Sequence, residues 1–280
     1  MKNYYAFLPG VYFIRSRLRT KHEVISWILI NPVVILMFSW PVSEISVAGF
    51  CIAFVLSFIA WQSTYEIGYI VNDMLTTKSE QSPTLRLSQG ERDYFEENFS
   101  RIVFGKILVT LLALAGVLYL DSMANTTLHV ELFVIATLGA LLAFWIHNKV
   151  RSRANIITYL FLSSFKYLSI PLLFYAATDI YLFILTIILS FPLLRTLEHA
   201  CKVKYGFSWL ASFFGSFDRF RPKYYGVVTL LALGLAVWDG SPELRIWLAI
   251  SAYFLVVRFV GFLASRRLKR SLPESYRWDS

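Results

Sequence analysis

Long apolar segments separated by short polar connections run the length of the chain. Eight of them are interpreted as membrane-spanning helices, which need about 20 residues to cross the hydrocarbon core. They cover residues 24–40, 46–72, 102–120, 130–147, 155–177, 179–197, 225–238 and 244–263. Most are too long for barrel strands, and open strands cannot satisfy their backbone groups in lipid. The pattern therefore predicts an all-α integral membrane protein, a bundle of about eight transmembrane helices.

A polar stripe crosses the second apolar segment and continues into the loop behind it. Its members follow at spacings of 4, 3, 4, 3 and 4 residues: Gln62, Glu66, Tyr69, Asp73, Thr76 and Glu80. At about 100° per residue they share one face of a helix. Ionisable groups at membrane depth are costly and usually face a bundle interior or a wet cavity. The stripe therefore predicts the wall of a site.

Composition separates this chain from large-cored soluble proteins. Apolar residues make up 57% and charged residues only 16%, and the mean hydropathy is +0.57. These values are typical of polytopic membrane proteins. We expect one membrane domain over residues 1–280, with an interfacial segment at 1–23 and cytoplasmic active-site loops at 73–101 and 198–224. The two cysteines, Cys51 and Cys201, have neither disulfide nor metal-site spacing.

The net charge of +9 is concentrated in alternate connections between the apolar segments. This distribution is explained by membrane topology, and no nucleic-acid-binding motif is present. The intervening connections are mainly acidic, with Arg245 as their only basic residue. The positive-inside rule then places both termini in the cytoplasm, which requires an even number of spans.

The N-terminal 23 residues mix aromatic residues with Arg15, Arg17 and Arg19. This mixture is typical of a segment lying on the cytoplasmic membrane surface. A disordered basic tail is the alternative.

The end of the stripe offers the first candidate site. Asn72, Asp73 and Glu80 suit Mg²⁺, which takes one or two carboxylates and fills its other positions with water and phosphate. Lys78 and Arg86 follow closely and are placed to meet phosphate oxygens. The alternative is a solvated helix terminus, although that reading leaves the deeper Glu66 unexplained.

The second candidate follows the sixth segment, where charged residues recur at helical spacing. Its members are Arg195, Glu198, His199 and Lys202. On one helix face the two cations can neutralise phosphates, while Glu198 can share a cation. The alternative is a Glu198–Lys202 pair on a wetted surface.

The fifth segment offers the third candidate. One of its faces is polar: Asn155, Tyr159, Ser163, Lys166 and Ser169. Lys166 lies at a depth that allows it to pair with Glu66, either as a structural ion pair or as a cation guarding a substrate cavity. Pro171 can kink this segment. A compact basic turn precedes it, with Lys149, Arg151 and Arg153.

These positions resemble the UbiA superfamily of intramembrane prenyltransferases and related polyprenyl-phosphate phosphoribosyltransferases. Members carry N-D-x-x-D-x-x-x-D at the cytoplasmic end of helix 2 and a second acidic motif after helix 6. The first motif is matched by Asn72, Asp73, Thr76 and Glu80, so a hydroxyl replaces its middle carboxylate. The second motif's place is taken by Glu198, His199 and Lys202. Eight spans instead of nine are a further departure.

The resemblance implies a Mg²⁺-dependent transfer of a prenyl or phosphoribosyl group from a diphosphate donor to a lipidic acceptor. The donor would be an isoprenoid diphosphate or phosphoribosyl diphosphate. Metal and basic groups would stabilise the leaving diphosphate within a water-poor cavity that opens to the cytoplasm. We expect a bacterial inner-membrane location.

The residue patterns and the resemblance together give the following expected roles. Chemistry is assigned to Glu66, Asp73 and Lys166. Phosphate binding is assigned to Lys78, Arg86, Lys149, Arg153, Arg195 and Lys202. The substrate cavity is assigned to Tyr69, Asn155, Tyr159 and His199. Mg²⁺ coordination is assigned to Asn72, Asp73, Glu80 and Glu198.

Two other classes of function fit the same scaffold. In a lipid or solute carrier, Glu66 and Lys166 would be gating or proton-coupled groups. In a non-catalytic component of a biosynthetic complex, the altered motifs, with Thr76 in the first, would no longer bind metal.

Overall fold

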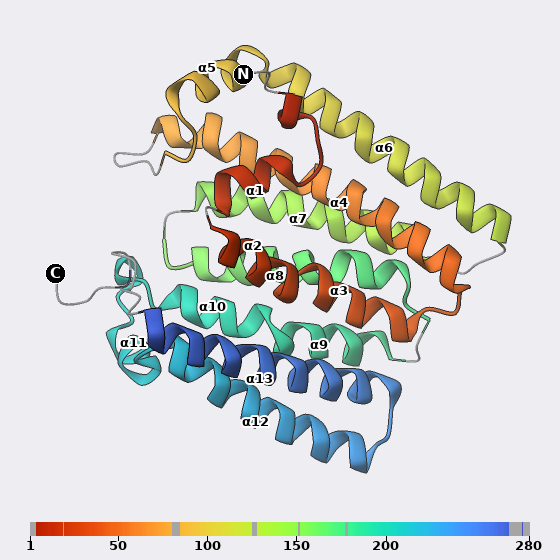
Figure 1. Ribbon diagram of the computed structural model, residues 1–280, viewed down its shortest axis with the longest axis vertical. Helices are drawn as coiled ribbons and strands as arrows, with labels where there is room; N and C mark the ends of the chain where they lie inside the picture. The colour runs from red at the N-terminus through yellow and green to blue at the C-terminus, as the bar shows by residue number, and fades with distance from the viewer. Residues whose placement is uncertain are drawn as a thin grey trace. The chain divides into compact units, whose positions relative to one another are not determined.

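The computed structural model describes residues 4–18, 20–79, 85–124, 128–150, 152–176, 179–268 and 276. All regular structure in these ranges is helical (Figure 1). The α-helices are α1 (Val11–Arg17), α2 (Lys21–Ile30), α3 (Pro32–Ser39), α4 (Val47–Met74), α5 (Gln89–Glu97), α6 (Phe99–Ala124), α7 (Val130–Lys149), α8 (Asn155–Leu173), α9 (Ile180–Ser190), α10 (Pro192–Ala200), α11 (Ser208–Phe214), α12 (Phe217–Trp238) and α13 (Pro242–Leu268). Short 3₁₀ turns cover Tyr4–Ala6, Trp40–Val42, Thr76–Ser79 and Val203–Tyr205.

The chain packs into two compact units, and each is described by itself. Unit 1 comprises residues 1–149 and 169–176, and unit 2 comprises residues 150–168 and 177–280. The first polar stripe therefore belongs to unit 1. The candidates around Arg195 and Lys166 belong to unit 2.

Every predicted apolar segment is helical, but two of them are broken at a proline. The first breaks at Asn31, which precedes Pro32, and the sixth bends by 44° between Ser190 and Pro192. Both breaks have one cause, because the residue before a proline is pushed out of the α-helical region. Pro171 does not break α8, which continues to Leu173.

Six stretches of helix are long and apolar enough to cross a membrane in the described part of the chain, and the bent α9–α10 pair would make a seventh. The structure thus supports an all-α bundle of membrane-spanning helices. The predicted seventh span, residues 225–238, is the apolar part of α12. Asp218, Arg219 and Arg221 occupy the first turns of that helix.

Close helix packing in unit 1 depends on glycines. At Gly68 of α4 an added Cβ would lie 2.8 Å from the ring of Phe144 on α7. At Gly116 of α6 it would lie 2.9 Å from Leu56 on α4. Small residues let helix backbones approach closely, which favours association within lipid. These contacts fix α4 between α6 and α7 and thereby orient its polar face.

A small aromatic core holds the polar end of α4 in place. Side chains from the N-terminal segment, α4, α5 and α6 are buried together: Tyr5, Ala6, Tyr12, Ile70, Met74, Leu87, Phe95 and Ile102. The ring of Tyr12 lies 5.1 Å from that of Phe95, a separation typical of packed aromatic pairs. The N-terminal segment is therefore part of the folded unit over residues 4–18, which contradicts the disordered-tail alternative.

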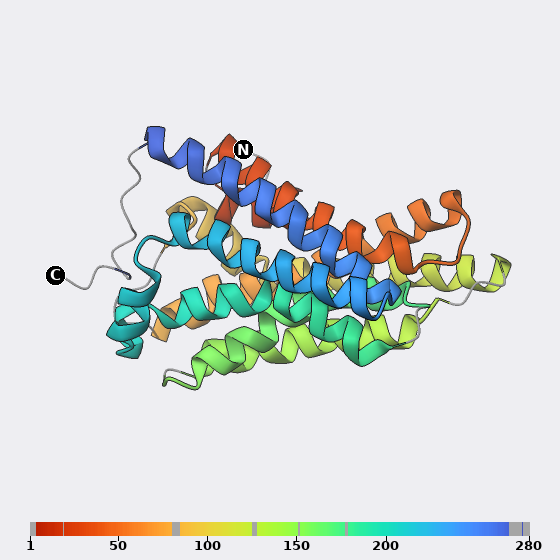
Figure 2. The same cartoon turned by 90° about the horizontal axis from the view of Figure 1, so that it is seen from below.

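In unit 2, α12 and α13 lie side by side, as the two blue helices of Figure 2 show. Their shared core contains Val228, Ala232, Leu244 and Trp247, with side chains of α9 packed against it. The short helix α11 exposes Trp209 and Phe213, as expected for a membrane-surface anchor or an interfacial lid.

Candidate functional site

Asp73, in the last turn of α4, lies at the centre of a cluster of cations in unit 1. Its carboxylate accepts two hydrogen bonds from the guanidinium of Arg17, at 2.7 and 3.0 Å. The hydroxyl of Tyr12 donates a third at 2.6 Å. Two parallel N–H···O bonds are the strongest geometry of an arginine–carboxylate pair. Helix α1 therefore docks onto α4 through its charged residues as well as through its aromatic core.

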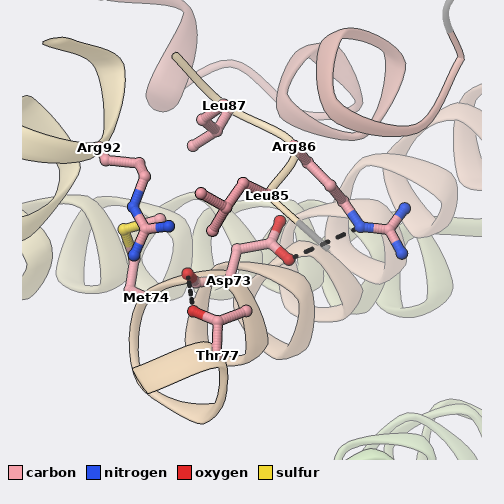
Figure 3. Close-up of a pocket in the computed structure, with 7 residues that line it drawn as sticks. All are labelled: Asp73, Met74, Thr77, Leu85, Arg86, Leu87 and Arg92. Atoms are coloured by element: carbon pink, nitrogen blue, oxygen red, sulfur yellow. Dashed lines mark hydrogen bonds and ion pairs between the residues drawn. The ribbon is translucent and has the colours of Figure 1, made fainter. Parts of the chain in front are cut away.

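Two more arginines complete the pocket around Asp73. Nε of Arg86 lies 4.0 Å from Oδ1 of Asp73, and Arg92 lines the same pocket. Figure 3 shows Arg86 and Arg92 on either side of Leu85, above Asp73. The remaining lining is largely apolar and includes Met74 and Leu87. The pocket thus combines cationic groups with an apolar wall.

The described lining of the pocket holds more positive than negative charge. Arg86 and Arg92 line the pocket with one carboxylate, Asp73, among the described residues, and Asp73 is already paired with Arg17. Burial, and then the neighbouring charge of Arg17, lower the pKa of Arg86 below its usual value. Arginine stays protonated even with this lowered pKa, so the electrostatic repulsion between the neighbouring arginines persists. A bound anion would relieve it.

Glu66, seven residues deeper in α4, has a different partner from the one predicted. Its carboxylate accepts a 2.5 Å bond from Nζ of Lys106, which is fully buried, and a 2.8 Å bond from the backbone N–H of Phe13. Lys106 also donates to the carbonyl of Leu8 at 2.8 Å. The predicted Glu66–Lys166 pair is therefore wrong, because both oxygens of Glu66 are already engaged within unit 1.

Glu66 also completes the start of α1. Phe13 is in the first turn of that helix, where backbone N–H groups have no intrahelical partner. The N-cap residue, Gly10, has no side chain to accept from them and takes a left-handed φ of 81°. The buried carboxylate replaces the missing cap. Glu66, on α4, thus has a structural role: it accepts hydrogen bonds from α1 and α6 and so joins the three helices.

Three of these groups, Lys106, Arg17 and Tyr12, were not among the predicted site residues. Lys106 lies within the predicted span 102–120, where a buried cation calls for a buried acid. That signal was present in the pattern. Arg17 and Tyr12 had no such signal, since nothing in residues 1–23 distinguishes them from their basic and aromatic neighbours.

The remaining predicted residues of unit 1 differ in how close they lie to Asp73. Tyr69 packs under Arg17, whose guanidinium lies 4.5 Å from the ring centre. Lys78 forms an exposed pair with Glu96 at 3.2 Å, and Lys149 lies 3.8 Å above the ring of Trp145. Asn72 donates to Asp73 at 3.3 Å. Of the predicted residues of unit 1 that the structure describes, Tyr69, Asn72 and Arg86 therefore lie near Asp73.

The donor set around Asp73 does not fit a Mg²⁺ site as it is placed here. Magnesium prefers several oxygen ligands, whereas both oxygens of Asp73 accept from N–H or O–H groups. No group of three or more His, Cys, Asp or Glu that could hold a metal occurs in the described ranges. Glu80 and Arg151 lie outside the described residues. The Mg²⁺ requirement stays a prediction, and no chemical step is assigned to the metal.

An acid-sensitive contact flanks the pocket at Glu91 of α5. Its carboxylate accepts from the hydroxyl and N–H of Ser88, from Tyr5 and from Arg15, all at 2.8–3.0 Å. Burial opposes ionisation of Glu91, but these hydrogen bonds outweigh it and hold its pKa below the usual 4.5. A lowered pKa contributes stability that is present above 4.5 and is lost as pH falls through the folded-state value.

We expect the N-terminal segment to loosen as pH falls below 4.5. The protection of the amides around Tyr5 against hydrogen exchange, measured relative to the intrinsic exchange rate at each pH, should then fall by an amount corresponding to about 1 kcal/mol or less for this partly exposed pair. Glu91→Gln should remove the pH dependence, whereas Glu97→Gln, at an exposed position on the same helix, should retain it. An unchanged profile in Glu91→Gln would show that another group controls the segment.

In unit 2, Glu198 of α10 is buried among arginines. Its carboxylate accepts from Arg195 and, at 2.7 and 3.0 Å, from Arg221 of α12. Arg221 also donates to Asp218 at 3.0 Å. The helix ends at Ala200, so the predicted face does not extend to Lys202. The ion pairs of Glu198 are thus to Arg195 and Arg221 instead of the alternative partner, Lys202.

A second polar network joins α8 to α10. The hydroxyl of Tyr205 donates to Oδ1 of Asn155 at 2.5 Å, and Nε2 of His199 lies 2.7 Å from the same hydroxyl. Burial raises the pKa of Tyr205 to about 12, so its proton is retained and is given to Asn155. We therefore assign the Nε2 proton to His199, which donates it to the Tyr205 oxygen. The ring of Tyr159 stacks on His199 at 4.1 Å.

This network brings together residues that the sequence placed in separate candidates. Asn155 and Tyr159 were predicted on the fifth segment and His199 just after the sixth, and the structure joins them within unit 2. Arg153 of the basic turn supports them by donating to the carbonyl of Tyr205 at 2.9 Å. Lys166 is half-buried, and the positive charge of Arg195 is near enough to repel it.

Comparisons with known proteins add nothing to this geometry: no protein-family model, no curated protein and no solved structure matches the chain.

Proposed function

We propose that the protein is a membrane-embedded transferase that binds a phosphorylated, lipid-soluble substrate in the arginine pocket of unit 1. The observation that carries this proposal is the pair of lining arginines, Arg86 and Arg92, beside an apolar wall, where the only lining carboxylate among the described residues, Asp73, is already paired with Arg17. Arginine recognises phosphate oxygens bidentately, and an isoprenoid chain suits the lining leucines. The donor would be an isoprenoid diphosphate or phosphoribosyl diphosphate, and the acceptor a lipid.

The residues of the pocket divide this work between them. Arg86 and Arg92 would bind the phosphate oxygens, while Asp73 and Tyr12 hold Arg17 in place beside them. During transfer the carbon–oxygen bond to the diphosphate breaks and the diphosphate keeps the electron pair. Fixed cations stabilise the charge that develops on it. The acceptor then forms the new bond to that carbon, and where its attacking atom carries a proton, that proton is released to water.

The orientation of the protein belongs to the same proposal. Basic connections alternate with acidic ones, which supports cytoplasmic termini, eight spans and a pocket facing the cytoplasm. A bacterial inner membrane is the expected location.

A non-catalytic or carrier-type membrane protein is the second candidate. It is favoured by the neutralisation of two acidic groups of the stripe by cations of the chain itself, Asp73 by Arg17 and Glu66 by Lys106. Such pairing leaves neither carboxylate available as a base or metal ligand without rearrangement.

The test is a transfer assay with reconstituted protein, labelled isoprenyl diphosphate or phosphoribosyl diphosphate, and a membrane lipid extract as acceptor source, with and without Mg²⁺. Arg92→Gln should lower kcat/KM about tenfold to a hundredfold, because a hydrogen bond to a charged group contributes roughly 1.5–3 kcal/mol. Arg101→Gln, which removes an exposed arginine from α6, should leave it unchanged. No transfer from either donor would favour the second candidate. Equal activity of the two variants would exclude the pocket as the site.

A further inference from the structure

The carboxylate of Asp73 is saturated with hydrogen-bond donors from the chain itself. Its Oδ2 accepts from the hydroxyl of Tyr12 at 2.6 Å and from Nη1 of Arg17 at 2.7 Å. Its Oδ1 accepts from Nη2 of Arg17 at 3.0 Å and from Nδ2 of Asn72 at 3.3 Å. A carboxylate offers about four lone-pair positions, and each of them here faces a donor. A metal ion would need those same lone pairs, so it cannot bind Asp73 while this set of contacts persists.

Arg17 is held in place by more than its ion pair. Its guanidinium lies 4.5 Å from the ring centre of Tyr69, and only 10% of its side chain is exposed. The helix that carries it is anchored independently, by the burial of Tyr12 in the aromatic core and by the 2.8 Å bond from the N–H of Phe13 to Glu66. The fold therefore builds a guanidinium into the position beside Asp73.

This built-in cation can do one part of the work of a divalent metal. A metal ion between a carboxylate and a diphosphate cancels the charge of the carboxylate and attracts the phosphate oxygens. Arg17 already cancels the charge of Asp73 through a bidentate ion pair. Arg86 and Arg92, which line the pocket, are placed to attract the phosphate oxygens. The three arginines together thus cover both tasks.

We propose that Arg17 takes the place of a divalent cation at Asp73, so that the pocket binds a diphosphate without Mg²⁺. The binding of a diphosphate rests on the proposed function, whereas the occupation of Asp73 by Arg17 rests on the contacts of unit 1 alone. The proposal opposes the Mg²⁺ requirement that the resemblance implies, and two measurements on the wild-type protein decide between them.

The first measurement is calorimetric titration of the full-length protein in detergent with inorganic pyrophosphate, in EDTA or in excess Mg²⁺. We expect binding in EDTA to be at least as tight as in Mg²⁺, because the chain supplies its own cation and complexed pyrophosphate carries less negative charge for the arginines to attract. The second measurement is a titration with Mn²⁺ alone, in which electron paramagnetic resonance reports the unbound ion. The wild type and Asp73→Asn should bind the same amount of Mn²⁺.

The decisive variant is Arg17→Met, compared with Arg15→Met on the same helix, where the arginine pairs with Glu91 instead of Asp73. In EDTA, Arg17→Met should weaken pyrophosphate binding about tenfold or more, because the uncovered carboxylate of Asp73 repels the diphosphate. Arg15→Met should bind as the wild type does. Arg17→Lys keeps the positive charge and should retain most of the affinity, which also keeps the test open if Arg17→Met does not fold.

Three results would overturn the proposal: wild-type binding of pyrophosphate that requires Mg²⁺, unweakened binding in Arg17→Met in EDTA, or wild-type binding of Mn²⁺ that Asp73→Asn loses. Absence of pyrophosphate binding under both conditions would count against the phosphate pocket of the proposed function. In that case the Mn²⁺ titration still decides whether Asp73 is closed to metal, so the two failures can be told apart.

Discussion

Replacing Lys106 with methionine is expected to lower the free energy of unfolding by about 3–5 kcal/mol, the usual cost of removing one partner of a buried ion pair. Both members of the pair are fully buried, and their charged atoms lie 2.5 Å apart. Without Lys106 the carboxylate of Glu66 stays in an apolar interior with only the N–H of Phe13, and the carbonyl of Leu8 loses its donor. Unfolding in detergent, followed by intrinsic fluorescence, measures the loss.

Two further variants show whether the cost comes from the buried pair. Lys78→Met removes one partner of an exposed pair with Glu96 and should change stability by less than about 1 kcal/mol. Combining Lys106→Met with Glu66→Gln should recover much of the loss, because no unpaired charge remains and the amide oxygen still accepts from Phe13. If the double variant is less stable than Lys106→Met, the loss does not arise from a stranded carboxylate.

Asp73→Asn is expected to abolish transfer and to reduce stability by about 3 kcal/mol. The side chain keeps its size, but one carboxylate oxygen becomes an NH₂ group that faces the N–H groups of Arg17 or the hydroxyl of Tyr12. Arg17, Arg86 and the rest of the pocket then have no counter-charge, and the docking of α1 onto α4 is weakened. The transfer assay and the unfolding experiment above measure the two effects separately.

Asp93→Asn is the matched control, since Asp93 is an exposed carboxylate on α5. It should leave both transfer and stability unchanged. Full transfer activity in Asp73→Asn would show that Asp73 has no part in the reaction. Unchanged stability would show that the Arg17–Asp73 pair contributes nothing to the fold, since the substitution removes the negative charge on which that pair depends.

Periodicity and hydropathy were sufficient to place the long apolar helices, although α1, α5 and α11 lie outside the predicted segments. All eight predicted apolar segments are mainly helical, because in lipid the backbone must bond within its own segment and this depends on composition and length alone. The polar stripe on α4 was also readable, since residues three and four apart share a face. Glu66 and Asp73 are both buried, as that face predicts. The breaks at Pro32 and Pro192 were not predicted, although they follow from the chemistry of proline.

Only the tertiary structure shows which cation pairs with each buried carboxylate. Glu66 pairs with Lys106, 40 residues away, and Asp73 with Arg17, 56 residues away. The pattern along one helix indicates that a buried charge needs a partner of opposite charge. The sequence contains several cations that could be that partner, and it does not distinguish between them. Packing of α1 and α6 against α4 brings Arg17 and Lys106 within reach.

The same division holds in unit 2. The sequence placed Arg195 and Glu198 together on one helix turn, because their spacing of three residues fixes it. Arg221 and Arg258 carried no local signal, and only the packing of α12 and α13 brings them to Glu198. The sequence by itself therefore determined that this is an all-α membrane protein with charged groups within its apolar helices. The tertiary structure decided which charges neutralise one another, because those contacts join helices far apart in the chain.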